Sequence, residues 1–157
     1  MTIDGESDDA RRNRQLTELL NELRVALPGV QMLFGFLLAV PFSQRFAQVT
    51  SNQQRLYYSA FAAAAAASVC FITPTAFHRI VWQHGDKGLL LRISSALAIV
   101  GTVFLAAAIG SVMLFITSYL YGTSYAAVAG SVLLAALVVL WYLVPLAVRL
   151  RLVNGGR

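Results

Sequence analysis

The chain has 157 residues, of which 58% are hydrophobic and 12% are charged, and its mean hydropathy is +0.68. A soluble domain carries about twice that charged fraction, so the composition indicates a membrane protein with several spans. The single Cys70 excludes a disulfide-stabilised secreted domain. The pI near 9.9 does not indicate nucleic-acid binding, because the basic residues lie at the ends of apolar runs and form no stripe.

Two polar segments precede the apolar runs. Residues 1–9 are acidic and almost free of apolar side chains, which predicts a disordered tail. Residues 10–26 place leucines at intervals of three and four, which predicts an amphipathic helix with Asp8 or Asp9 as its N-cap and Arg14–Glu18 as an ion pair. This helix is expected to lie in the membrane interface, to pack on cytoplasmic parts of the protein, or to bind another protein. Pro28-Gly29 is expected to break it before the chain enters the bilayer.

Four apolar runs are long enough to cross a hydrocarbon core of about 30 Å as helices. They cover approximately 27–47, 56–77, 89–121 and 125–148, and no charged residue interrupts the middle of any of them. A barrel strand would alternate apolar and polar residues, which these runs do not. The sequence therefore predicts an all-α polytopic membrane protein. Residues 149–157 are expected to form a basic cytoplasmic tail. The first span is expected to stay in the mature protein, because no Ala-x-Ala-like site follows Val40.

The basic residues between the spans predict the orientation, because Lys and Arg in short loops resist translocation. Ten of them fall on one side: Arg11, Arg12, Arg14, Arg24, Arg79, Lys87, Arg92, Arg149, Arg151 and Arg157. Only Arg45 and Arg55 fall on the other. Both termini and the central loop are therefore predicted to be cytoplasmic. Tyrosines map to the opposite interface, as an aromatic belt would require: Tyr57, Tyr58, Tyr119, Tyr121 and Tyr125.

Small residues are frequent in the last three spans. Ala62–Ala67 form a run, and Ala106-x-x-x-Gly110 and Ala126-x-x-x-Gly130 have the spacing that lets helix backbones approach closely. Such faces are expected to pack the four helices within one chain, or to form the seam of a homo-oligomer. No heptad or tandem repeat is recognised.

Polar and kinking residues of the first span are the candidate functional positions. Gln31 lies one turn inside the span, Pro41 is expected to kink the helix, and Gln44 and Arg45 lie at its outer end. Gln31 could line a path or form an interhelical hydrogen bond, and Arg45 could simply extend to the headgroups. The serines and threonines of the later spans, Ser94 among them, are expected to bond the preceding turn.

The central loop holds the other polar cluster. His78, His84 and Asp86 could form a metal or acid–base site, but their spacing matches no established ligand pattern. Asp86 is better explained as the N-cap of the third span. No carboxylate lies within a span, and no nucleotide-binding loop, zinc-protease motif or nucleophile elbow is present. We therefore predict no catalytic residue, no cofactor and no metal.

Two stretches resemble a family of small bacterial integral membrane proteins classed as a domain of unknown function. The first is Glu22-Leu23-Arg24 followed by Pro28-Gly29-x-Gln31-x-Leu33-Phe34-Gly35, then Pro41-Phe42 and Arg45-Phe46. The second is Pro74-Thr75-Ala76-Phe77-His78-Arg79 followed by Gly85-Asp86-Lys87. The resemblance implies a four-span inner-membrane protein and no particular activity.

Two classes of function remain from these observations. The first is a non-enzymatic membrane module, such as a scaffold, an accessory subunit or an envelope-stress protein. The alternative is a small homo-oligomeric channel or facilitator, with Gln31, Ser43 and Gln44 along its path. The expected location is the bacterial plasma membrane, and the expected partners are the bilayer and its anionic headgroups at the cytoplasmic face.

Overall fold

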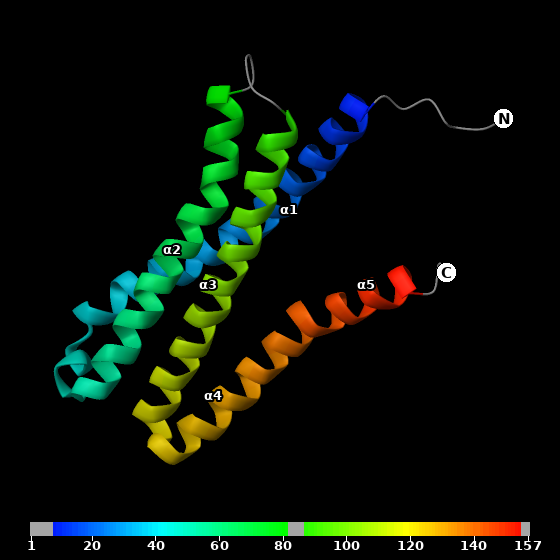
Figure 1. The fold of residues 1–157 in the computed structure, drawn as a ribbon. Coiled ribbons are helices and arrows are strands. Elements are labelled where there is room, and N and C mark those ends of the chain that lie inside the picture. Colours follow the sequence, from blue (N-terminus) through cyan, green and yellow to red (C-terminus); the bar gives the residue numbers. More distant parts are fainter. Residues whose placement is uncertain (1–7, 82–86, 155–157) are drawn as a thin grey trace. The chain divides into compact units, whose positions relative to one another are not determined.

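The computed structural model describes residues 8–81 and 87–154, which form helices and, within these ranges, no strand. The predicted all-α class is confirmed. The α-helices are α1 (Asp8–Ala39), α2 (Ser51–Val81), α3 (Lys87–Tyr121), α4 (Thr123–Val138) and α5 (Val144–Asn154) (Figure 1). Two 3-10 helices, η1 (Val40–Phe42) and η2 (Gln44–Gln48), follow α1, and a π-helical turn, η3 (Val139–Leu143), joins α4 to α5.

Four helical stretches are long and apolar enough to cross a membrane: Asn13–Phe42, Ser51–Phe77, Gly88–Tyr121 and Thr123–Arg151. The chain is therefore an all-α polytopic membrane protein. The last stretch runs through η3, which ends two residues before Pro145. Proline has no amide hydrogen and its ring clashes with the carbonyl four residues earlier, so a wider turn at this point accommodates it.

Helix α1 corrects the predicted break at Pro28-Gly29. It continues through both residues, and Pro28 lies inside it. Pro28 and Gly29 are exposed, whereas Val30 next to them is buried. The missing amide and the ring therefore face away from the packed side of the helix. Transmembrane helices tolerate proline in this way, because packing of the opposite face offsets the lost hydrogen bond.

The chain divides into two compact units, of which the first comprises Met1–Ser43 and Phe61–Leu105. The buried residues of α1 in this unit are Leu16, Leu23, Val30 and Leu37, each seven residues after the last. The facing part of α2 buries Ala64, Ala67, Phe71 and Pro74, in steps of three and four. This spacing is typical of two helices that pack at a shallow angle. The buried residues of α1 and α2 therefore follow a heptad pattern, which the sequence analysis does not predict.

Small residues bring the helices of the first unit close together. The ring of Phe71 is buried against α3 where residue 101 is glycine, and a Cβ on Gly101 would lie 2.6 Å from Phe71 Cδ1. Phe71 also packs with Leu23, Val30 and Ala67 in the core of this unit. Phe34 and Phe61 stack with their ring centroids 4.9 Å apart. Leu23, earlier on α1, packs in the same core as Phe71, later on α2, so the two helices are antiparallel.

The amphipathic segment, residues 10–26, packs within the first unit. Leu16 and Leu23 are only 4% and 6% exposed, so the leucine stripe of residues 10–26 is covered within the protein. It belongs to the same helix as the first span and is neither a separate interfacial helix nor a free docking face. Arg14 and Glu18 form the predicted pair, with Nε 3.9 Å from Oε1 on exposed side chains. Such a pair contributes well under about 1 kcal/mol.

The second unit comprises Gln44–Ala60 and Ala106–Arg157. Helices α3 and α4 pack closely here through reciprocal contacts. A Cβ on Gly110 would lie 2.6 Å from Leu134 Cδ2, and one on Gly130 would lie 2.7 Å from Leu114 Cγ. The small residues of these two spans are thus used within the chain. Phe46 and Phe115 flank Tyr57, with centroid distances of 5.3 and 6.0 Å.

The ends of several elements differ from the predicted ones. Of the predicted acidic tail, residues 1–7 lie outside the described residues, but Asp8 and Asp9 already belong to α1, where carboxylates favour a helix N-terminus. The predicted basic tail is helical through Asn154, as part of α5, because Leu and Arg are good helix formers. Pro41 does not kink a continuing helix: α1 ends at Ala39, and Pro41 lies in η1.

Candidate functional site

The predicted polar positions of the first span are divided between the two units. Gln31 and Pro41 belong to the first unit, and Gln44 and Arg45 belong to the second. All four side chains are exposed. No hydrogen bond or ion pair joins any of them to one another within the described residues. Gln31 therefore projects from α1 on a different side from its buried neighbour Val30.

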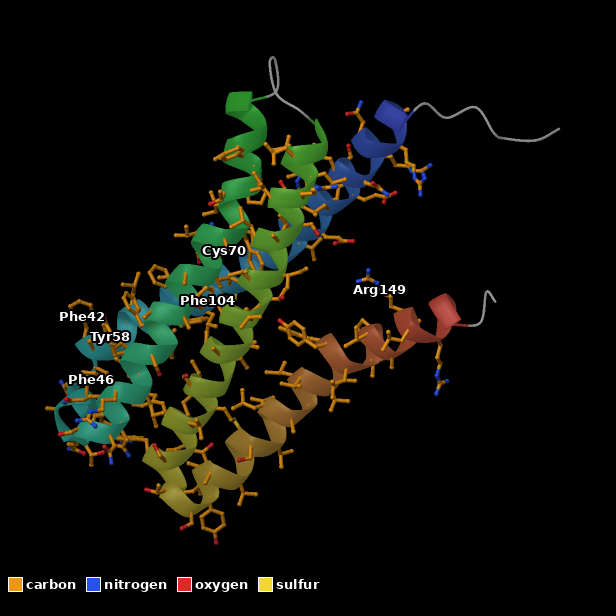
Figure 2. All side chains as sticks on the ribbon, in the orientation of Figure 1. Phe42, Phe46, Tyr58, Cys70, Phe104 and Arg149 are labelled. Atoms are coloured by element: carbon orange, nitrogen blue, oxygen red, sulfur yellow. The ribbon has the colours of Figure 1, made fainter. Side chains whose placement is uncertain are left out.

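The predicted loop cluster falls mostly outside the described residues. The backbone of His78 lies in α2, whereas His84 and Asp86, with its predicted N-cap role, lie in the undescribed loop. Among the described residues, no three His, Cys, Asp or Glu side chains are grouped so that they could hold a metal ion. Cys70, which Figure 2 shows on α2, is unpaired and half-buried.

A polar groove that the sequence analysis missed lies between α1 and α3 in the first unit. It encloses about 330 Å³ and is lined by Gln15, Glu18, Leu19 and Glu22 from α1 and by Leu91 and Ser95 from α3. Glu18 and Glu22 are four residues apart and so share one face of α1. Helical spacing could have placed both on one face, but the opposite wall depends on how α3 packs.

Ser94 lies on α3, directly before Ser95 of this groove. It is completely buried, and its hydroxyl has no hydrogen-bond partner among the described residues. Ser94 is thus an exception to the expectation that the hydroxyls of these spans can bond the preceding turn. Other residues do so: Thr102 Oγ1 donates to the Ile99 carbonyl at 2.7 Å, and Ser118 Oγ donates to the Phe115 carbonyl at 2.9 Å. A buried hydroxyl without a partner destabilises the fold by about 1–3 kcal/mol.

A second groove lies between α1 and α2 and combines apolar walls with a single positive charge. It encloses about 220 Å³ and is lined by Leu20, Leu23, Arg24 and Leu27 from α1 and by Phe71 and Thr75 from α2. Sequence reasoning counted Arg24 only as a determinant of topology. The antiparallel packing of α1 on α2 brings Thr75 to the same groove as Arg24. The register of the two helices cannot be read from a single sequence.

The comparison with known families agrees with this architecture. Residues 5–145 match the model of a family of unknown function, DUF6328. The chain belongs to this family. The predicted resemblance to a family of unknown function is thereby confirmed. No curated protein and no solved structure matches the chain.

Proposed function

We propose that the protein is a non-enzymatic membrane module of the bacterial plasma membrane, with both ends of the chain in the cytoplasm. It serves as a scaffold or accessory subunit and acts through its helix faces and through the end of the first unit that carries the two grooves. No catalytic residue, cofactor or metal belongs to this proposal.

The observation that supports the proposal best is the continuity of α1. The helix has 32 residues, and at 1.5 Å per residue it is about 48 Å long, against a hydrocarbon core of about 30 Å. Its buried stripe begins at Leu16, before the predicted span, and ends at Leu37, inside it. The segment that precedes the span is therefore packed in one unit with the span itself. A scaffold needs such packing, because the surface that it offers to a partner beside the membrane must be held in a fixed position.

The alternative is a small homo-oligomeric channel, and one observation favours it. Gln31 is exposed and has no side-chain hydrogen bond to a described residue, so it is available to a seam between copies of the chain. Against this alternative, the side chains that the described residues bury are apolar with the exception of Ser94. A path inside one chain would need more polar lining than this.

Flux through liposomes distinguishes the two functions. The purified full chain is reconstituted, and the release of K⁺ and of a small neutral solute is compared with that of protein-free liposomes. The proposal expects no flux above the protein-free level. Flux that is lost in Gln31→Leu but kept in Gln54→Leu, an exposed glutamine outside the predicted path, would overturn it in favour of the channel.

A further inference from the structure

The groove between α1 and α2 has the composition of a binding site for an amphipathic molecule with a negative charge. Leu20, Leu27 and Phe71 supply apolar walls, Arg24 supplies the one charged group, and Thr75 supplies a hydroxyl. The groove is open on one side and smaller than a typical drug-sized pocket, so it suits a polar head and one segment of a chain.

Arg24 has no described partner for its charge. Its side chain is exposed, and no carboxylate among the described residues forms an ion pair with it. The acidic residue nearest in sequence, Glu22, lines the other groove. A guanidinium exposed beside apolar side chains at the edge of a span is available to an anion, and its fork of five N–H donors matches a phosphate. Thr75 Oγ1 has no described intramolecular hydrogen bond and can donate to the same phosphate.

The depth of the two polar residues fits the boundary of a membrane. Arg24 precedes the predicted start of the first span by three residues, and Thr75 precedes the predicted end of the second span by two. Because α1 and α2 are antiparallel, these positions lie at the same end of the helix pair. Leu27 and Phe71 lie about one turn further toward the apolar part of each helix, so these two side chains lie beneath a polar mouth at the headgroup level, and Leu20 lies about one turn to its cytoplasmic side.

We infer that this groove binds one anionic phospholipid, with the phosphate on Arg24 and Thr75 and the upper part of one acyl chain against Leu27 and Phe71. The inference rests on the part of the proposed function that places this end of the first unit at a membrane surface. Because Arg24 lies on the predicted cytoplasmic side, the lipid comes from the cytoplasmic leaflet. Basic side chains attract anionic lipids in that leaflet, and the walls of the groove add a fit to the shape of one lipid.

Native mass spectrometry of the full chain in detergent tests the inference. Phosphatidylglycerol and phosphatidylcholine with identical acyl chains are added at equal concentrations, and the retained adducts are counted. We expect one retained phosphatidylglycerol, and about a 10- to 100-fold lower affinity for it in Arg24→Ala, the range for a hydrogen bond to a charged group. Arg24→Lys should lose less than Arg24→Ala, and Thr75→Val should weaken binding several-fold. Arg92→Ala, which removes an exposed arginine of α3 outside the groove, is the matched control and should bind normally.

Three results would overturn the inference. Equal retention of the two lipids, or unchanged binding in Arg24→Ala, would show that the charge recognises no headgroup. Displacement of the lipid by millimolar inorganic phosphate, with unchanged binding in Leu27→Asn, would show an ion site without a chain-binding wall. Loss of lipid binding leaves the liposome flux unaltered, so failure here and failure of the proposed function are distinguishable. Arg24 is exposed, so the melting temperature of its variants checks that the fold is intact.

Discussion

Gly122 is the single residue between α3 and α4, and its backbone lies at φ +90° and ψ 170°. Side chains with a Cβ rarely adopt this region, which is almost confined to glycine. Its amide donates to the Ser118 carbonyl at 3.2 Å, and its carbonyl accepts from the Ala126 amide at 3.2 Å. One residue therefore ends one span and begins the next.

Substitution of Gly122 by alanine should destabilise the protein by about 1–3 kcal/mol, although no atom would clash with the new Cβ, because the cost is backbone strain. Gly29→Ala is the matched control. Gly29 lies inside α1 with nothing within 4 Å of the added Cβ, so alanine there should be neutral or stabilise by up to about 1 kcal/mol. Denaturant unfolding in detergent micelles measures both. Equal effects of the two substitutions would contradict this account of the turn.

The start of α2 could have been predicted from the sequence, whereas the burial of Ser94 could not. Helix α2 begins at Ser51, five residues before its predicted start, and the signal for this is Thr50-x-x-Gln53. The Thr50 amide donates to Gln53 Oε1 at 3.0 Å, and the Gln53 amide donates to Thr50 Oγ1 at 3.4 Å. This capping box is a known sequence signature. The burial of Ser94 has no comparable signal, because it depends on which face of α3 meets its neighbours.

Helix α1 shows how tertiary packing overrides a local signal. Pro28 inside a helix costs about 3 kcal/mol in isolation, which is why the sequence predicts a break there. Burial of Leu16, Leu23, Val30 and Leu37 on one continuous stripe outweighs that cost. The leucine periodicity of residues 10–26 was recognised in the sequence. Its continuation at the same seven-residue interval into the span was hidden, because nearly every residue beyond Leu27 is apolar.

The stripe predicts a sharp contrast between two neighbouring positions of α1. Leu23 is 6% exposed and belongs to the core of the first unit, whereas Val25 is 81% exposed. Leu23→Ala should lower stability by about 2–5 kcal/mol, as buried leucine truncations do, and Val25→Ala by less than about 0.5 kcal/mol. Thermal unfolding in detergent provides the measurement. Comparable effects at both positions would mean that the stripe is not packed within the protein.

At the scale of the whole molecule, the apolar runs were sufficient to predict four spans, since only helices can satisfy their backbone in a bilayer. The grooves were not predictable, because each combines residues from two helices whose register follows from packing. The fourth span is the least packed: its most apolar stretch buries no residue within the chain, and Arg149 projects from α5 near its end (Figure 2). Lipid is the environment that suits its exposed apolar side chains.

The proposed orientation predicts which residues react with a membrane-impermeant thiol reagent. Single cysteines are placed in a Cys70→Ala background and labelled in intact cells. Cysteines at Asn52 and Thr123 should react, because they lie in the first turns of α2 and α4, at the ends of those spans with few basic residues nearby. Cysteines at Gln83 and Asn154 should react only after the cells are opened. Labelling at Gln83 in intact cells would reverse the orientation and move the Arg24 groove to the outer leaflet.

The central claim is that one unbroken helix joins the span to the segment before it, and a distance across Pro28 tests it most directly. Spin labels are attached to cysteines at Arg11 and Leu38, both exposed positions of α1, in the Cys70→Ala chain reconstituted in nanodiscs. A continuous helix predicts a narrow distribution centred at about 40 Å, from a rise of 1.5 Å per residue. A right-angled break at Pro28, with the first segment lying on the membrane surface, predicts about 30 Å from the same rise. A distribution centred near the shorter distance, or spread broadly between the two, would contradict the account.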